Sequence, residues 1–366
     1  MSGSAAAAAS LLIVTSPAVA AAGVWSVSPT PSSGLGNDWI NGAGAVSDSD
    51  AWAVGTTFIV PDANGVTAIP LALHWNGTAW SIVATPAVTV STTLTGVAAS
   101  SATDAWAVGS SPLGYHSSVP VVLRWSGSAW SAAVQPAASG ALAAVADLGA
   151  ANAWAVGRAG RFGPQLIEHW DGTAWTAMSA PEPDPTYTSG SQLLAISARA
   201  ANDVWALGRS STVGAYAEHW NGSAWSVTLL AAGSGDLPSA VVAVGTDNVW
   251  ATVNTNAGGN AYIQHWNGTA WSVSATRPAT EYPTLAGITA RSATDVWAVG
   301  GFLGNITTPT PTREIRTLHW DGTQWTAGTA PNGGGSQLNG SALAPGGART
   351  WAVGTSTGAF ILTRTD

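Results

Sequence analysis

Two glutamates have a type and placement that could support hydrolytic chemistry. Glu168 and Glu218 each precede a His-Trp pair in neighbouring copies of a repeated pattern. Paired carboxylates hydrolyse glycosidic bonds when they lie roughly 5 to 9.5 Å apart, and we expect strands far from a common axis to hold these two groups farther apart. Arg158 and Arg209 follow a Trp-Ala-Val-Gly-type motif in the same two repeats, and an antiparallel hairpin would bring each opposite its own glutamate. The sequence therefore favours two cross-strand ion pairs over a catalytic pair, and we assign no catalytic residue.

Histidines recur at one position of the pattern, where they could bind a metal ion or transfer protons. These residues are His74, His169, His219, His265 and His319, with Arg124 at the equivalent position of the second repeat. Equivalent positions around a ring lie too far apart to share one ion. We therefore expect each histidine to make a structural hydrogen bond, directed at a nearby Asp/Asn turn, and we predict no metal site and no cofactor.

Every tryptophan except Trp39 belongs to the repeated pattern. One set begins a Trp-Ala-Val-Gly motif or a close variant, one follows the repeated histidine or arginine, and one lies five residues after the second set. The three sets are Trp52, Trp106, Trp154, Trp205, Trp250, Trp297 and Trp351; Trp75, Trp125, Trp170, Trp220, Trp266 and Trp320; and Trp80, Trp130, Trp175, Trp225, Trp271 and Trp325. Trp25, near the N-terminus, matches the third set. Indole faces can stack on sugar rings, but a residue repeated in every unit is typical of the contact between units. We expect these tryptophans in the core.

Each unit predicts four short strands that would hold these side chains in place. In the second unit we place them at Leu94–Ser100, Ala105–Gly109, Val121–Trp125 and Ala129–Val134. In six units, Asp or Asn lies two residues before the first tryptophan, as in an Asx turn. Asn-Gly, Asp-Gly or Ser-Gly precedes the last strand, as in a tight hairpin. Four-stranded units of this length are typical of the blades of a β-propeller.

The two ends of the chain predict how many blades there are and how the ring closes. The seventh unit ends after its third strand, Phe360–Arg364. Near the N-terminus, residues 23–27 match residues 78–82, the last strand of the first unit. We therefore predict an all-β, seven-bladed propeller of four-stranded antiparallel blades, a single domain over residues 23–366. The N-terminal strand would close its last blade in a 3+1 arrangement.

The strand and hairpin motifs together resemble a known repeat family. They are most complete at Trp154–Trp175 and Trp297–Trp325, and they resemble the propeller repeats of Asp-box (BNR, sialidase-like) proteins, especially the photosystem II assembly factor type and related secreted bacterial proteins. The resemblance covers the chain after residue 22 and implies a propeller scaffold. It does not imply sialidase activity, because Asp171 and Trp175 are one position closer than in an Asp box, and no arginine triad or Tyr/Glu pair is found.

Composition excludes several classes of protein. The chain has no cysteine, which rules out a disulfide scaffold, a thiol enzyme or a zinc ribbon. Its 11 basic residues are all arginine against 19 acidic ones, a net charge of -8, so we expect no nucleic-acid partner and no binding to anionic membranes. With 46% hydrophobic and only 8% charged residues, the chain is expected to fold.

The first 22 residues predict a secretory signal peptide without the usual basic start. This alanine-rich apolar run ends near an Ala18-x-Ala20 cleavage pattern. A membrane anchor is the alternative, but the break at Ser16-Pro17 leaves an apolar run shorter than the ~20 residues of a spanning helix. We expect a secreted, extracellular monomer with no membrane span in the mature chain.

Candidate binding residues come from the loops between strands 4 and 1 and between strands 2 and 3, which vary in length on one face. Variable loops on a rigid scaffold commonly carry binding sites. The candidates are Trp39, Phe58, Tyr115, His116, Arg161, Phe162, Tyr187, Tyr282, Phe302 and Arg313. The structural alternative is that the aromatic side chains only anchor long loops.

Two functions remain open from the sequence. The first is a non-enzymatic binding module that recognises a polysaccharide or a protein partner through the variable loops. The alternative is a glycan hydrolase or lyase with a site at the central channel. The absence of a nucleophile motif, a metal constellation or a close carboxylate pair favours the first.

Overall fold

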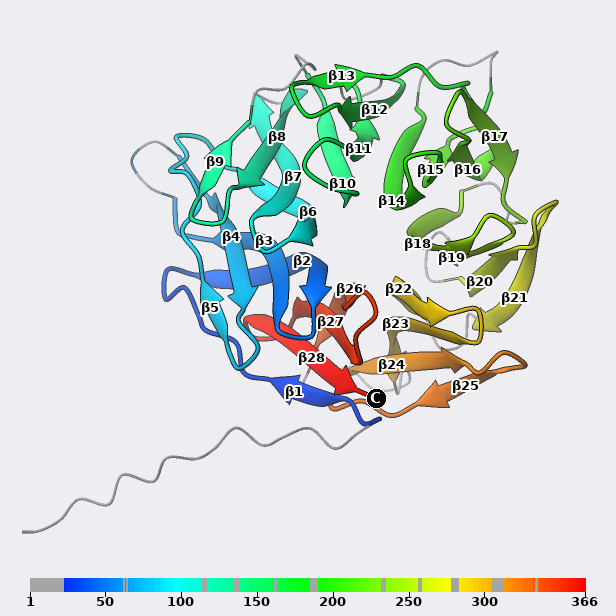
Figure 1. The fold of residues 1–366 in the computed structure, drawn as a ribbon. Coiled ribbons are helices and arrows are strands. Elements are labelled where there is room, and N and C mark those ends of the chain that lie inside the picture. The colour runs from blue at the N-terminus through cyan, green and yellow to red at the C-terminus, as the bar shows by residue number, and fades with distance from the viewer. Residues whose placement is uncertain are drawn as a thin grey trace, which may run out of the picture.

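The chain forms a ring of seven four-stranded antiparallel sheets, seen in the computed structural model in Figure 1. Within the residues that the structure describes there are 28 strands. The described residues are 23–61, 63, 65–113, 117–133, 139–160, 163–184, 190–231, 235–255, 259–277, 283–304, 312–332 and 335–366. The predicted seven-bladed propeller is confirmed.

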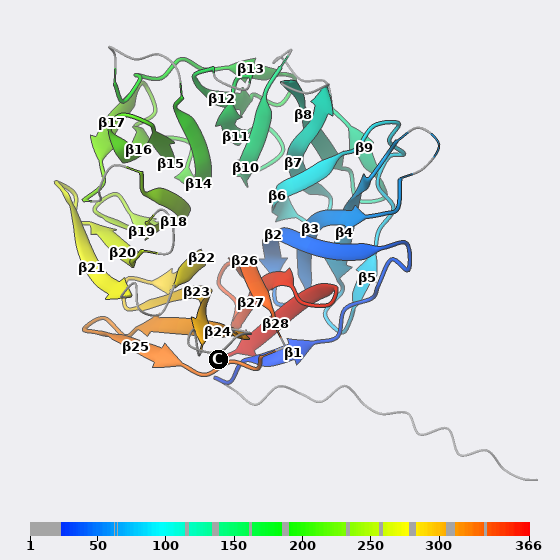
Figure 2. The same cartoon turned by 180° about the vertical axis from the view of Figure 1, so that it is seen from behind.

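The first strand of each blade surrounds the axis of the ring, as both views show (Figures 1 and 2). These strands are β2 (Asn37–Ser47), β6 (Thr93–Ser101), β10 (Ala141–Asp147), β14 (Gln192–Ala200), β18 (Leu237–Gly245), β22 (Thr284–Ser292) and β26 (Gln337–Leu343). Each of these strands has a β-bulge directly after a buried or half-buried residue, as between Ile40 and Gly42. A bulge bends a strand locally, and here it recurs in all seven blades where the strand lines the channel.

The second strand of each blade carries the first set of tryptophans into the core. These strands are β3 (Asp50–Phe58), β7 (Asp104–Leu113), β11 (Ala153–Arg158), β15 (Asp203–Ser210), β19 (Asn248–Asn254), β23 (Asp295–Gly304) and β27 (Arg349–Thr355). All seven of these tryptophans are buried, and Trp52 is completely inaccessible. The expectation that they form core contacts is confirmed.

The third strand follows in the hairpin order that the motifs predict. These strands are β4 (Ala68–Trp75), β8 (Ser117–Trp125), β12 (Gln165–Trp170), β16 (Gly214–Trp220), β20 (Ala261–Trp266), β24 (Thr312–Trp320) and β28 (Ala359–Thr365). In the second blade, β7 and β8 extend beyond their predicted ends by several residues. Leu113 pairs with Ser117 there, so the hairpin continues past the repeated motif.

The fourth strand is short and lies at the rim. These strands are β5 (Trp80–Ile82), β9 (Trp130–Ala132), β13 (Trp175–Ala177), β17 (Trp225–Leu229), β21 (Trp271–Arg277), β25 (Trp325–Gly328) and β1 (Ser26–Ser28). The hairpin that leads into it needs a glycine with positive φ, as at Gly77 (φ 96°). The oxygen Oδ1 of Asn76 accepts hydrogen bonds from the backbone amides of Thr78 and Ala79, which confirms the predicted turn chemistry.

The ring closes through the N-terminal strand, as predicted. Strand β1 pairs with β28, and their sheet runs in the order β1-β28-β27-β26. Trp25, just before β1, is 3% exposed and meets Trp297 of blade 6 edge to face, with ring centroids 6.1 Å apart. The first and last segments of the chain therefore share one hydrophobic cluster and leave no open blade.

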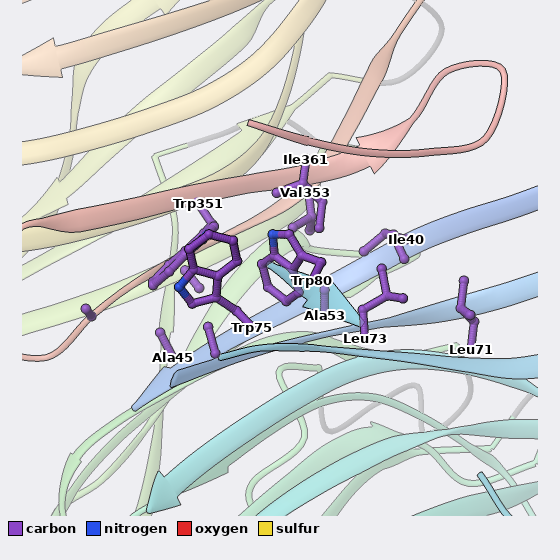
Figure 3. Packing of buried hydrophobic residues seen from close by; sticks show 13 residues of the cluster. Ile40, Ala45, Ala53, Leu71, Leu73, Trp75, Trp80, Trp351, Val353 and Ile361 are labelled. Carbon is purple, nitrogen blue, oxygen red and sulfur yellow. The ribbon is translucent and has the colours of Figure 1, made fainter. Parts of the chain in front are cut away.

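Neighbouring blades are joined by tryptophan contacts. Trp52 of blade 1 packs against both Trp125 and Trp130 of blade 2, at centroid distances of 4.8 and 4.9 Å. Figure 3 shows the equivalent contact where blade 7 meets blade 1: Trp351 lies beside Trp80 and near Trp75. Tilted and edge-to-face indole pairs gain energy beyond simple burial.

A side-chain network behind each tryptophan confirms the structural role of the repeated histidines. In blade 1, His74 Nε2 bonds to Asp50 Oδ1 at 2.8 Å, and the imidazole stacks on Trp52. The same bond to the turn Asp or Asn recurs at the other four histidines. Arg124 replaces histidine in blade 2, where it pairs with Asp104 and covers the ring of Trp106.

We predict that Trp25→Ala destabilises the ring by ~3–5 kcal/mol, the usual loss for removing a buried aromatic side chain. Trp39→Ala is the control, because its side chain is 44% exposed and belongs to no core cluster; it should cost less than ~1 kcal/mol. Urea unfolding followed by tryptophan fluorescence measures both variants. Equal losses of unfolding free energy in the two would contradict closure through Trp25.

Candidate functional site

The two faces of the ring differ in the loops they carry. The turn face holds the short connections between strands 1 and 2 and between strands 3 and 4. The loop face holds the connections between strands 2 and 3 and between strands 4 and 1, which differ from blade to blade. The four candidate residues that the structure describes, Trp39, Phe58, Phe302 and Arg313, lie on the loop face.

An exposed aromatic pair lies on the loop face of blade 1. Trp39 of β2 and Phe58 of β3 meet edge to face, with centroids 5.4 Å apart and planes at 78°. The two side chains are 44% and 40% exposed, respectively. A large part of each ring is therefore open to solvent.

A buried carboxylate holds the chain beside this pair. Asp38 is 2% exposed and accepts hydrogen bonds from the Ser33 amide at 2.7 Å and the Thr57 hydroxyl at 2.6 Å. Burial by itself would raise the pKa of Asp38, but its hydrogen bonds, led by those from Ser33 and Thr57, outweigh burial and lower it. The ionised group thus fixes the entry to β2 next to Trp39.

A second feature of the loop face is a cavity of about 370 Å³ across blades 5, 6 and 7. Phe302 and Arg313, both predicted from the sequence, line it together with Glu314 and Gln337. Arg313 Nη1 donates to Gln337 Oε1 at 2.8 Å. The volume of the cavity falls within the range of small-ligand pockets.

The remaining candidates cannot be placed. Tyr115, His116, Arg161, Phe162, Tyr187 and Tyr282 lie outside the described residues. The structure thus brings Phe302 and Arg313 together at one cavity, and puts Trp39 and Phe58 together at another part of the same face.

Glu314 and Gln337 were not among the residues predicted from the sequence. The signal for Glu314 was its adjacency to Arg313 in the Thr-Arg-Glu-Ile-Arg segment, which sets opposite charges side by side before a buried strand. Gln337 carries no local signal, because only the packing of blade 7 against blade 6 brings its amide to Arg313.

The central channel is the place expected for the enzymatic alternative. Its cavity of about 240 Å³ is lined by three residues from each of the seven inner strands, and none of these lining residues is ionisable. Its polar side chains instead join blades: Asn41 Nδ2 donates to Leu94 O at 2.7 Å, and Thr95 Oγ1 donates to Leu142 O at 2.9 Å. The lining therefore supplies no side chain for general acid-base catalysis.

Glu168 and Glu218 are both completely buried, so neither can contact a glycan from solvent. The predicted cross-strand partners are also wrong: the register places Arg158 opposite Gln165 and Arg209 opposite Ala215. The hairpins pair Glu168 with Ala155 and Glu218 with Ala206. Each arginine lies three residues after that alanine along the second strand. The register aligns Trp154 with His169 and Trp205 with His219, so each arginine faces the start of the third strand, three residues before its glutamate.

Glu218 instead belongs to a polar contact between blades 3 and 4. Gln165 Nε2 donates to Glu218 Oε1 at 2.8 Å, and Tyr216 donates its hydroxyl hydrogen to Gln165 Oε1 at 2.7 Å. Burial raises the pKa of Glu218 to about 8, with a smaller rise from Glu182 and an opposing effect of the Gln165 hydrogen bond. Glu218 is therefore protonated in the folded protein at neutral pH.

The described residues contain neither a metal-ligand cluster nor a membrane-spanning helix. Those residues contain no cluster of three or more His, Asp or Glu side chains suited to a metal ion. The same part of the chain contains no helix of the length and hydrophobicity needed to cross a bilayer.

The raised pKa of Glu218 predicts a pH-dependent stability. In the unfolded chain a glutamate has its ordinary pKa near 4.5, so the folded state gains stability from protonated Glu218 that is complete below that value and disappears as pH rises toward 8. Glu218→Gln mimics the protonated form at every pH. We expect its stability relative to the parent to increase between pH 4.5 and 8, reaching roughly 3–5 kcal/mol.

Urea unfolding of both proteins at pH 5, 7 and 9 measures this difference. Ile82→Ala is the control, because it changes no ionisable group and Ile82 is 41% exposed on β5; its effect on stability should be the same at all three pH values. A constant difference between Glu218→Gln and the parent at all three pH values would disprove the buried, protonated state.

Searches with the sequence find no matching family model and no matching curated protein. Solved structures do share the fold. YCF48 bound to a D1 peptide superposes with a TM-score of 0.62 at 14% identity, covering 96% of this chain and 100% of that one. YCF48 from Cyanidioschyzon merolae has a TM-score of 0.62 at 17% identity, with 93% and 99% coverage.

A fucose-specific lectin from Aleuria aurantia has a TM-score of 0.50 at 14% identity, covering 83% of this chain and all of the lectin. At such identities the likeness establishes the propeller fold alone. The chain is thus a seven-bladed β-propeller with YCF48 among its structural neighbours, while membership of the Asp-box family stays a prediction.

Proposed function

We propose that this protein is a secreted, non-enzymatic binding module that recognises a polysaccharide or a protein partner through its loop face. The observation that carries the proposal is the exposed pair of Trp39 and Phe58 on blade 1. Every other tryptophan in the described residues is buried or half-buried in the blades. Trp39 alone among them turns a large fraction of its indole to solvent.

The surroundings of the pair suit a contact surface. Leu35 is 63% exposed and Val60 86% exposed, and both lie in the loops that flank Trp39 and Phe58 along the chain. Exposed apolar side chains that gather in one patch commonly mark an interaction site. Indole rings suit the apolar face of a sugar as well as an apolar side chain, so the pair fits either kind of ligand.

The rest of the molecule gives this surface a fixed shape. Asp38 ties the segment before β2 to β3, and the tryptophan contacts between blades hold β2 and β3 in the ring. A preformed surface loses little conformational entropy on binding. This rigidity supports a recognition role better than one that requires closure around a substrate.

Two structural neighbours illustrate the kinds of ligand that propellers accept. YCF48 was solved with a D1 peptide, and the Aleuria aurantia protein is a fucose-specific lectin. These ligands belong to those proteins. They support keeping both a protein partner and a polysaccharide in the proposal for this chain.

The remaining parts of the proposal rest on the sequence and on the channel. Export is inferred from the apolar residues 1–22, which lie outside the described residues. A non-enzymatic role is inferred because no observation at the channel favours the hydrolase or lyase alternative.

The proposal predicts that Trp39→Ala lowers affinity for the ligand at least tenfold, as expected for an aromatic residue at the centre of an interface. Affinity electrophoresis on a panel of soluble polysaccharides measures binding, and reducing ends released into the same samples report hydrolysis. For a protein partner, immobilised parent and Trp39→Ala protein are compared for capture from culture fluid of the source organism. We expect binding without product release.

Ile82→Ala is the control, because Ile82 is 41% exposed but lies on the outer strand β5, away from the start of β2. It should bind as the parent does. Ligand retention that is equal in the parent and in Trp39→Ala, or sugar release by the parent, would disprove the proposed mode of action.

A further inference from the structure

The cavity across blades 5, 6 and 7 combines three kinds of group that could contact a ligand. Arg313 offers a donor, Glu314 an acceptor and Phe302 an aromatic wall, all from the hairpin of β23 and β24. In the register of that hairpin, Glu314 is paired with Phe302 and Arg313 with Leu303. Two adjacent residues of one strand thus bring opposite charges to one cavity.

Arg313 is oriented by a chain of hydrogen bonds along the inner edge of the ring. Its Nη1 donates to Gln337 Oε1, Gln337 Nε2 donates to Asn339 Oδ1 at 3.1 Å, and Asn339 Nδ2 donates to the backbone oxygen of Ile40 at 2.8 Å. Among the described residues, Gln337 is the only hydrogen-bond partner of the Arg313 guanidinium, which carries five N–H donors. The donors that Gln337 does not engage are the ones we assign to a ligand.

Glu314 supplies the opposite capability. Within the described part of the chain, no hydrogen bond or ion pair engages its carboxylate. Apart from Arg313, the other residues that line the cavity are neutral. An ionised carboxylate accepts hydrogen bonds and cannot donate them, whereas a guanidinium only donates. A hydroxyl group does both, so a ligand rich in hydroxyls satisfies Glu314 and Arg313 at once.

Part of the cavity wall is apolar. Phe302 contacts Arg316, whose guanidinium carbon lies 4.4 Å from the ring centroid, and Leu237 and Pro283 add apolar surface to the lining. An aromatic ring with a fixed orientation packs well against the C–H face of a sugar ring. Arg316 itself is not among the residues that line this cavity.

The charges on the cavity also bear on the ligand. Arg313 and Glu314 are its only charged lining residues in the described chain, and their charges cancel. An anionic ligand would be repelled by the Glu314 carboxylate, and a cationic ligand by the Arg313 guanidinium. Each repulsion costs binding free energy in a partly enclosed site. Neutral ligands avoid both penalties.

We propose that this cavity is a binding site for one residue of a neutral sugar, with Arg313 donating to its hydroxyls, Glu314 accepting from them and Phe302 packing on its C–H face. This site rests on the proposed binding function, whose polysaccharide form it specifies. It is separate from the Trp39 and Phe58 pair, which lies on blade 1. The cavity selects the sugar, and the aromatic pair adds contact area to a longer chain.

Isothermal titration calorimetry against neutral cello-, xylo-, manno- and chito-oligosaccharides, with oligogalacturonate as an acidic probe, tests the site. We expect the parent to bind at least one neutral probe more tightly than the acidic one. Arg313→Met and Glu314→Gln should each weaken that binding at least tenfold, because each removes hydrogen bonds that involve a charged group. Phe302→Leu should weaken it several-fold.

Arg199→Met is the matched control, because Arg199 pairs with Asp203 at the turn-face end of β14. It should bind as the parent does, and circular dichroism should show all four variants folded. Preference for oligogalacturonate, or failure of the parent to bind any neutral probe, would overturn the neutral-sugar site.

The same variants separate this site from the proposed function. Neutral-sugar binding that is lost in Trp39→Ala but unchanged in Arg313→Met and Glu314→Gln would overturn the cavity site and leave binding by the loop face intact. Binding that is lost in the cavity variants but unchanged in Trp39→Ala supports the cavity site and contradicts the role given to the aromatic pair.

Discussion

The packing of one indole per blade against the next blade is the interaction on which the structure depends. Each blade is a small antiparallel sheet that cannot bury both faces by itself. A second-strand tryptophan such as Trp52 fills the space between two blades, and its histidine or arginine neighbour fixes its orientation. Trp25 supplies the last of these contacts against Trp297, so closure of the ring requires both ends of the domain.

This interlocking core explains how a chain with few charges forms a stable scaffold with a variable face. The turn-face hairpins repeat because Asn or Asp at the turn and glycine with positive φ meet the same backbone demand in most blades. The connections on the loop face do not share one backbone geometry, so their sequences vary between blades. Function is therefore expected where the repeat ends, at Trp39 on one side of the ring and at Arg313 and Glu314 on another.

Buried polar groups occur at positions where a blade departs from the repeated sequence pattern. Glu218 occupies a position that is leucine in blades 1 and 2, and it is tolerated because Gln165 and protonation compensate for its burial. Its chemistry is that of a structural contact between blades. The channel shows the opposite pattern, since its small and neutral lining serves mainly to join neighbouring strands.

The sequence by itself determined the fold, the number of blades, the closing strand and the roles of the repeated tryptophans and histidines. Those features follow from local turn chemistry and from spacing that recurs in every unit. Only the tertiary structure decided the exposure of Trp39, the meeting of Arg313 with Gln337, and the partners of Glu168 and Glu218. The hairpin register decides which side chains face each other, and contacts between blades join residues that no local spacing relates.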